Sequence, residues 1–102
     1  MPGHVLEIAR FVPQAGMAEG VHAYVDAGRE KVWVELGPAV FVDAQPLQLA
    51  VGDAVTVTGA LVTRGDDHVV LASVVAKDGK SLKLRSESGD PAWSKFKPRT
   101  AR

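Results

Sequence analysis

The chain has 102 residues, of which 46% are apolar and 24% charged, with a formal net charge of zero and no cysteine. A chain of this length forms one domain with a single core. Zero net charge gives no global signature of binding to nucleic acid or to an acidic membrane surface. The lack of cysteine excludes disulfides, thiolate nucleophiles and cysteine-based zinc sites, and no apolar run reaches the ~18 residues of a membrane span.

The charges are distributed unevenly along the chain. Residues 1–76 carry four Lys and Arg against nine Asp and Glu, a net of −5, whereas residues 77–102 carry eight against three, a net of +5. This pattern predicts a mildly acidic body and a basic tail. The first four residues, M-P-G-H, lack the basic start and apolar stretch of a signal peptide. We therefore expect a cytoplasmic protein, or an exported one if a native signal peptide was removed.

The N-terminal stretch predicts a strand followed by a loop. Residues 4–12 are rich in aliphatic side chains. Phe11 breaks their alternation, which indicates a bend or bulge near Ala9. Residues 13–19 contain proline and glycine and predict a loop.

Residues 20–36 form two alternating runs on either side of Gly28 and Arg29. Glycine at the first position of a two-residue loop accepts the positive φ of a type II′ turn, so we predict a hairpin. Counting outward from the turn gives these pairs: Asp26 with Lys31, Val25 with Val32, Tyr24 with Trp33, Ala23 with Val34, and His22 with Glu35. A slip by one residue would put the valines in water and the charges in the core.

The third strand is predicted to end at Gly37, because Pro38 cannot donate to a strand ladder. Residues 39–42 are a short apolar run that we expect to resume a strand briefly. Asp43 is the predicted N-cap of a helical turn within residues 43–50.

Two further strands are predicted in the second half of the chain. Residues 54–62 place Val55, Val57 and Leu61 on one face, and Gly59 inside this strand indicates a bulge. A strongly β-branched fifth strand covers residues 68–76.

The composition of the chain changes in its C-terminal third. Asp78 and Gly79 predict a turn, and residues 81–85 alternate like a short edge strand with basic residues outward. Trp93 follows a loop, and we expect it to cover one end of the folded sheet rather than to bind a ligand. The last residues, 95–102, are basic and are predicted to form a mobile tail.

The order of these elements, β-β-β-α-β-β in about 75 residues, is that of an OB-fold, a small five-stranded Greek-key barrel. We therefore predict an all-β OB-fold over residues 3–76 with a short helical turn between its third and fourth strands. A C-terminal strand and capping extension follows over residues 77–94, and the basic tail over 95–102. The alternatives are a sandwich of five or six strands and an SH3-like barrel.

Four motifs stand out in the chain: G-M-A-E-G-V-H at 16–22, L-G-P at 36–38, V-G-D-A-V-T-V-T-G at 51–59 and L-R-S-E-S-G-D-P-A-W at 84–93. In this combination the chain resembles a family of small bacterial OB-fold proteins of unsettled function, which are often exported and described as nucleic-acid-binding-like. The resemblance implies the fold and a location in the cell envelope. It implies no catalytic residues.

Tyr24 and Trp33 are the strongest candidates for ligand binding. OB-folds bind oligonucleotides on the outer face of their second and third strands, and aromatic rings there stack on bases. Arg29 and Lys31 would add positive charge, and so would Lys83 and Arg85 if they lie alongside. Alternatively, the two rings only support the sheet as a cross-strand pair.

Acidic residues weaken the nucleic-acid hypothesis, because a groove that follows a phosphate backbone should be positive. Asp26, Glu30 and Glu35 lie among the candidate residues. The compensating charge would have to come from the basic C-terminal third.

His22 completes the predicted ligand-binding set. Together with Glu35 it provides too few ligands for a closed zinc site, although Met17 would add the soft donor that copper prefers. The simpler interpretation is a surface histidine in a cross-strand ion pair. We therefore expect no metal and no cofactor.

The sequence contains no glycine-rich phosphate loop and no nucleophile elbow, so we expect no enzyme. Three hypotheses remain. The first two are an OB-fold module for single-stranded nucleic acid or a similar polyanion, and a module that binds a protein or small ligand in the bacterial cell envelope. A metal-handling or enzymatic role is a third. A basic stripe joining Trp33 to Lys83 and Arg85 would favour the first hypothesis, and a native signal peptide the second.

Overall fold

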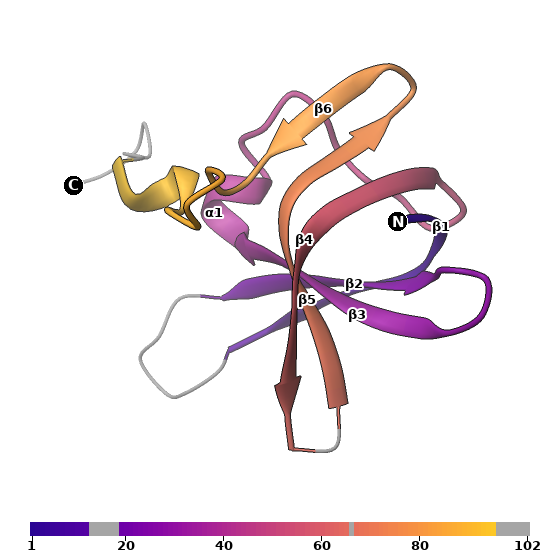
Figure 1. Cartoon of the computed structure of the whole chain (residues 1–102). Coiled ribbons are helices and arrows are strands. Elements are labelled where there is room, and N and C mark those ends of the chain that lie inside the picture. Colours follow the sequence, from indigo (N-terminus) through magenta and orange to yellow (C-terminus); the bar gives the residue numbers. More distant parts are fainter. Residues whose placement is uncertain (13–18, 66, 96–102) are drawn as a thin grey trace.

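The computed structural model describes residues 1–12, 19–65 and 67–95 (Figure 1). In these ranges the chain forms six strands, a short α-helix and a 3₁₀ helix: β1 Pro2–Phe11, β2 Gly20–Asp26, β3 Lys31–Pro38, α1 Ala39–Val42, β4 Ala54–Arg64, β5 Asp67–Lys77, β6 Lys80–Lys83 and η1 Ala92–Lys95. The protein is therefore mainly β, as the sequence predicts.

The strands pair in the order β3-β2-β1-β4-β5-β6, and all of these neighbours are antiparallel. A parallel pairing of residues 33–35 with residues 69–71 joins β3 to β5. This last pairing closes β1 to β5 into a ring. The C-terminal end of β4 and the N-terminal end of β5 project from the ring as a hairpin. β6 extends the sheet beside the C-terminal end of β5 (Figure 1).

The core lies inside the ring and is built from alternate side chains of each strand. Val5, Val25 and Val32 pair across β1, β2 and β3, and each is at most 4% exposed. Burying one such side chain stabilises the fold by roughly 1.5–3 kcal/mol. The same buried cluster continues through β4 and β5 to Leu82 and Leu84.

The β2–β3 hairpin has the predicted register. Asp26 pairs with Lys31, Tyr24 with Trp33 and His22 with Glu35. Gly28 has a φ of 95° and its N–H donates to Asp26 Oδ1 over 2.9 Å, while the N–H of Ala27 donates to the carbonyl of Glu30. The positive φ is what required glycine at the first loop position.

The bulge in β1 lies at a different place from the one predicted. The register shifts between Val5 and Glu7, which leaves Leu6 as the extra residue, whereas pairing continues regularly through Ala9 to Phe11. Leu6 is exposed as a result. The prediction near Ala9 was wrong because it assumed that Phe11 belongs to the core, and Phe11 lies on the outer face opposite Gly20.

The bulge at Gly59 is confirmed, and its geometry explains the glycine. The register between β4 and β5 shifts between Thr58 and Gly59, so that Ser73 on β5 is the extra residue. A Cβ on Gly59 would lie 2.9 Å from the Cα of Ala72, closer than real Cβ atoms approach. The carbonyl of Ser73, freed from β4, accepts the N–H groups of Leu84 and Arg85 and thereby anchors the C-terminal extension.

Leu61 lies on the same face of β4 as Val57, as predicted, because Leu61 pairs with the buried Val70 and Val57 with the buried Val75, but Leu61 itself is not covered. Val55 and Val57 are buried, whereas Leu61 is 63% exposed. The reason is tertiary, because β4 pairs with β1 only at residues 54–56. At Leu61 the strand has left the ring and pairs with β5 alone.

The helical element between β3 and β4 occurs four residues earlier than predicted. Residues 39–42, expected to resume a strand, form α1, and Asp43 is its C-cap instead of an N-cap. Ala39, Phe41 and Val42 are buried against the ring, and the N–H of Ala39 donates to the carbonyl of Glu19. A run of four apolar residues has no period that distinguishes helix from strand, so this choice is made by packing.

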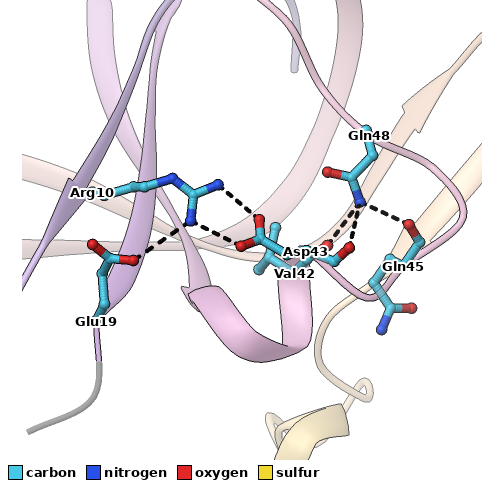
Figure 2. A network of polar contacts seen from close by, with 6 residues as sticks. All are labelled: Arg10, Glu19, Val42, Asp43, Gln45 and Gln48. Atoms are coloured by element: carbon cyan, nitrogen blue, oxygen red, sulfur yellow. Dashed lines mark hydrogen bonds and ion pairs between the residues drawn. The ribbon is translucent and has the colours of Figure 1, made fainter. Parts of the chain in front are cut away.

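A polar network holds α1 and the loop after it against β1 (Figure 2). Arg10 Nη1 and Nη2 donate to the carboxylate of Asp43 over 3.0 and 2.7 Å, and Arg10 Nη1 also lies 3.6 Å from Glu19 Oε1. The hydrogen bond from Arg10 lowers the pKa of Asp43 below its ordinary value. On the other side of Asp43, the Gln48 amide donates to the carbonyls of Val42 and Gln45.

The C-terminal extension closes one end of the ring. Asp78 and Gly79 form the predicted turn with positive φ values of 53° and 77°, and β6 is an edge strand with its lysines exposed. Trp93 packs against the core, with its ring 5.6 Å from that of Phe41 and close against Gly37. Residues 96–102 of the predicted tail lie outside the described residues, as does Met17.

Candidate binding face

The pairing registers assign side chains to the outer face of the ring, opposite the core. Glu7, Tyr24 and Trp33 lie side by side on β1, β2 and β3, because Glu7 pairs with Tyr24 and Tyr24 with Trp33. His22 and Glu35 lie next to them as the neighbouring pair of β2 and β3. Since paired residues of antiparallel strands point to the same side, these side chains share one surface.

Four rings make contact on this surface, which we call the aromatic row: Phe11, His22, Tyr24 and Trp33. The ring centroids of Phe11 and His22 are 4.1 Å apart, those of His22 and Trp33 6.0 Å, and those of Tyr24 and Trp33 4.8 Å. All of the rings are tilted relative to their neighbours, and all are half-buried. The row therefore crosses β1, β2 and β3 without a break.

Phe11 was absent from the set predicted by sequence. It reaches the row because it pairs with Gly20, whose missing side chain leaves room for its ring. A Cβ on Gly20 would lie 2.9 Å from Phe11 Cε1. The only signal in the sequence was the departure of Phe11 from the alternation of the first strand, which was interpreted as a bend.

Two aliphatic residues of β5 continue the surface beyond Trp33. Val69 pairs with Trp33 and Leu71 with Glu35 through the parallel pairing that closes the ring. Val69 is buried although it does not belong to the core cluster. This indicates that side chains of the outer face cover it, and that the apolar surface extends from β1 to β5.

His22 lies between the other rings and faces Glu35, as predicted. Its Nε2 is 3.6 Å from Glu35 Oε1, and the two side chains are 20% and 21% exposed. This nitrogen is buried and has no hydrogen-bond partner among the residues that the structure describes. Within residues 1–12, 19–65 and 67–95, His, Cys, Asp and Glu nowhere gather in groups of three or more that could hold a metal ion.

The charge around the aromatic row is mainly negative. Glu7, Asp26 and Glu35 lie on the outer face of β1, β2 and β3, while Lys31 supplies positive charge opposite Asp26. Arg29 is exposed in the hairpin turn, beyond the end of both strands. The hairpin thus brings Tyr24, Trp33 and His22 together and leaves Arg29 and Lys31 at one end.

Lys83 and Arg85 lie elsewhere in the fold. Lys83 pairs with Val74 on β5, five residues further along that strand than Val69, the neighbour of Trp33. Five strand residues span about 17 Å. The guanidinium of Arg85 lies 4.9 Å from the centre of the Trp93 ring and donates to the carbonyl of Gly89.

These features define a small, mainly β protein whose sheet closes in a ring and carries a contiguous aromatic surface on its outer face. Residues 1–82 match the sequence model of the MamS/MamX magnetosome protein family. The match covers most of the chain, and the protein belongs to this family. Neither a curated protein nor a solved structure matches it. In the described part of the chain, no helix has the length and apolarity needed to cross a membrane.

Proposed function

We propose that this protein is a non-enzymatic binding module with an OB-fold. The support is the closed pairing of β1-β2-β3-β5-β4, together with a helix between β3 and β4. That order of elements is typical of OB-folds, which bind extended ligands on the outer face of their central strands.

The aromatic row is the proposed binding surface, and it is the observation that carries the proposal. Four half-buried rings, each in contact with the next, lie on three paired strands and form a surface that is already ordered before a ligand binds. Aromatic side chains dominate the binding energy of protein interfaces, because each buries a large area at little cost in conformational entropy. A purely supporting role needs only the pair Tyr24 and Trp33, not a row extended to Phe11.

A protein is the ligand class that the surroundings of this surface favour. Three carboxylates and one lysine accompany the rings on β1, β2 and β3, and a phosphate backbone would be repelled by that balance. Lys83 lies about 17 Å along β5 from the row, and Arg85 lies over the ring of Trp93 instead. We place the module at the magnetosome, because that is the setting named by its family.

Photo-crosslinking in the native cell tests this proposal. Tyr24 is replaced by benzoylphenylalanine, which keeps a ring in the row, and a matched variant carries the same crosslinker at the exposed Ser81 of β6. We expect a protein adduct from position 24 that is absent from position 81 and that Trp33→Ala removes. The same adducts from both positions, or none from position 24, would contradict a binding role for this face.

Single-stranded nucleic acid is the second candidate ligand, favoured by rings that can stack on bases. Under this alternative, oligo-dT should quench the fluorescence of Trp33 at low salt. Trp33→Ala should then weaken binding by roughly 1–3 kcal/mol, and affinity should fall with salt at a slope of about −0.7 per phosphate contacted. Because the face is acidic, we expect no quenching.

A further inference from the structure

We infer that the partner segment recognised by the aromatic row carries an arginine, whose guanidinium lies over the Tyr24 and Trp33 rings and pairs with Glu7. This inference rests on the proposed function, since it names the chemistry of the partner that binds there. Three observations carry it: the position of Glu7, the charge balance of the face, and the arginine that the same chain places over its other tryptophan, Trp93.

Glu7 lies beside the pair of rings formed by Tyr24 and Trp33. It is directly opposite Tyr24, which is directly opposite Trp33. Neighbouring strands are about 4.8 Å apart, so a carboxylate and two rings occupy a strip of about 10 Å. A guanidinium over the rings would therefore be within reach of the carboxylate.

Glu7 is available for such a contact. Its side chain is exposed, and in the part of the chain that the structure describes it has neither an ion pair nor a hydrogen bond. Its acidic neighbours are already engaged, because Asp26 Oδ1 accepts the N–H of Gly28 and Glu35 lies 3.6 Å from His22 Nε2. Glu7 is thus the carboxylate that a cation from another molecule can pair with at no cost to existing contacts.

The electron-rich face of an aromatic ring attracts cations, tryptophan most strongly. Carboxylates beside the rings strengthen this attraction and repel anions. The outer face of β1, β2 and β3 holds three carboxylates, Glu7, Asp26 and Glu35, against Lys31, which pairs with Asp26 two residues before Trp33. The surface around Tyr24 and Trp33 therefore favours a positively charged group.

Arginine fits this surface better than lysine. A guanidinium is planar, so it can stack on a ring while its N–H groups form paired hydrogen bonds with a carboxylate. The chain itself uses this arrangement at Trp93, where the guanidinium of Arg85 lies 4.9 Å from the ring centre. Trp33 has rings and carboxylates around it but no described cation within the ring-contact distance that Arg85 has to Trp93.

The test uses short synthetic peptides in which arginine alternates with threonine, a residue that favours extended chains. Binding to the full chain is measured by calorimetry, and Trp33 emission is followed in a Trp93→Phe variant. The key comparison replaces every arginine with citrulline, which keeps the planar shape but carries no charge. We expect the arginine peptide to bind roughly tenfold more tightly than the citrulline peptide.

Variants of the protein test whether the arginine of the peptide lies beside Glu7 and Trp33. Glu7→Gln should weaken the arginine peptide about twofold to fivefold, the usual range for an exposed ion pair, and should leave the citrulline peptide unchanged. The matched control Glu87→Gln removes an exposed carboxylate from the loop after β6 and should have no effect on either peptide. Trp33→Leu should weaken the arginine peptide roughly tenfold while the protein remains folded.

Several results would overturn the inference. Equal binding of the arginine and citrulline peptides would do so, as would equal effects of Glu7→Gln and Glu87→Gln. If the protein adduct at position 24 persists in either case, the binding module stands and only the chemistry of its partner is wrong. Self-association of the chain that Glu7→Gln abolishes would assign the face to a second copy and overturn the partner assignment.

Discussion

The two tryptophans of this protein are similarly half-buried but lie in contrasting surroundings. Trp93 packs on Phe41, lies against the backbone of Gly37 and has Arg85 over its ring. Trp33 contacts His22 and Tyr24 on the outer face of the ring of strands, where the carboxylates of Glu7, Asp26 and Glu35 outnumber the one lysine, Lys31. Trp93 is completed by its own chain, whereas Trp33 presents a face that the described residues of the chain leave open.

This contrast separates a structural from a functional aromatic residue at similar exposure. Fractional burial alone would rank the two side chains together. What distinguishes them is whether the groups that complement a ring, an apolar neighbour below it and a cation above it, come from the same chain. Variants of the two residues should therefore affect different quantities, stability for Trp93 and binding for Trp33.

Trp93→Ala should have the largest effect on stability. Truncating a fully buried tryptophan costs about 3–5 kcal/mol, and because Trp93 is half-buried we expect a loss of about 2–3 kcal/mol in the free energy of unfolding. Urea denaturation followed by circular dichroism measures this loss. A matched Trp33→Ala variant should lose about 1 kcal/mol or less. Equal losses in the two variants would contradict the contrast drawn above.

Gly37→Ala should be next in size, with a loss of about 2 kcal/mol from backbone strain and crowding. Gly37 has a φ of 141°, and an added Cβ would lie 2.8 Å from Trp93 Cζ3. Gly28→Ala is the control, because its φ is also positive but its Cβ would meet open space. Combining Gly37→Ala with Trp93→Ala should cost less than the sum of the single changes. An additive double variant would show that Trp93 does not press on Gly37.

The Tyr24 and Trp33 rings should show a coupling free energy of roughly 0.5–1 kcal/mol in a double-mutant cycle on stability. Their centroids are 4.8 Å apart and the residues are directly paired. The same cycle between Tyr24 and Trp93 should give additive effects, since the two are not in contact. Coupling of the same size in both cycles would indicate a general loss of packing rather than a specific ring pair.

The smallest effect is expected at Asp43, whose carboxylate accepts hydrogen bonds from Arg10 on the surface. The pKa of Asp43 is lowered in the folded state from its ordinary value of 3.8. The unfolded chain therefore binds this proton more readily, so the contribution to stability is complete above that ordinary value and is lost as the pH falls through the folded pKa. Asp43→Asn should be slightly less stable than wild type near neutral pH and no less stable in strong acid. A stability difference that stays constant with pH would exclude this ion pair as its cause.

Several features could be predicted because they depend on residues close together in the sequence. The register of the β2–β3 hairpin follows from Gly28 and from the match of valines on one face with polar and aromatic residues on the other. Gly59 indicated its bulge because only glycine tolerates the backbone of Ala72 at that distance. Edge lysines likewise indicated that β6 is exposed on one side.

Other features were decided by contacts between distant parts of the chain. The apolar run at 39–42 carries no period, so its helical form depends on Phe41 and Val42 being buried against the ring. Phe11 joined the aromatic row only because β1 pairs with β2 in a register that places it over Gly20.

Contacts between distant strands also decided which charged residues lie on the binding face. The sequence placed Tyr24, Trp33 and His22 on one surface, since a single hairpin holds all three. It could not say whether Lys83 and Arg85 lie beside them, because that depends on where β6 joins β5 and on where β3 pairs with β5 to close the ring. The paired residues of β3 and β5 are 36 positions apart in the sequence. Short-range patterns determine register and turns, whereas the sign of the charge around a surface depends on how the strands close.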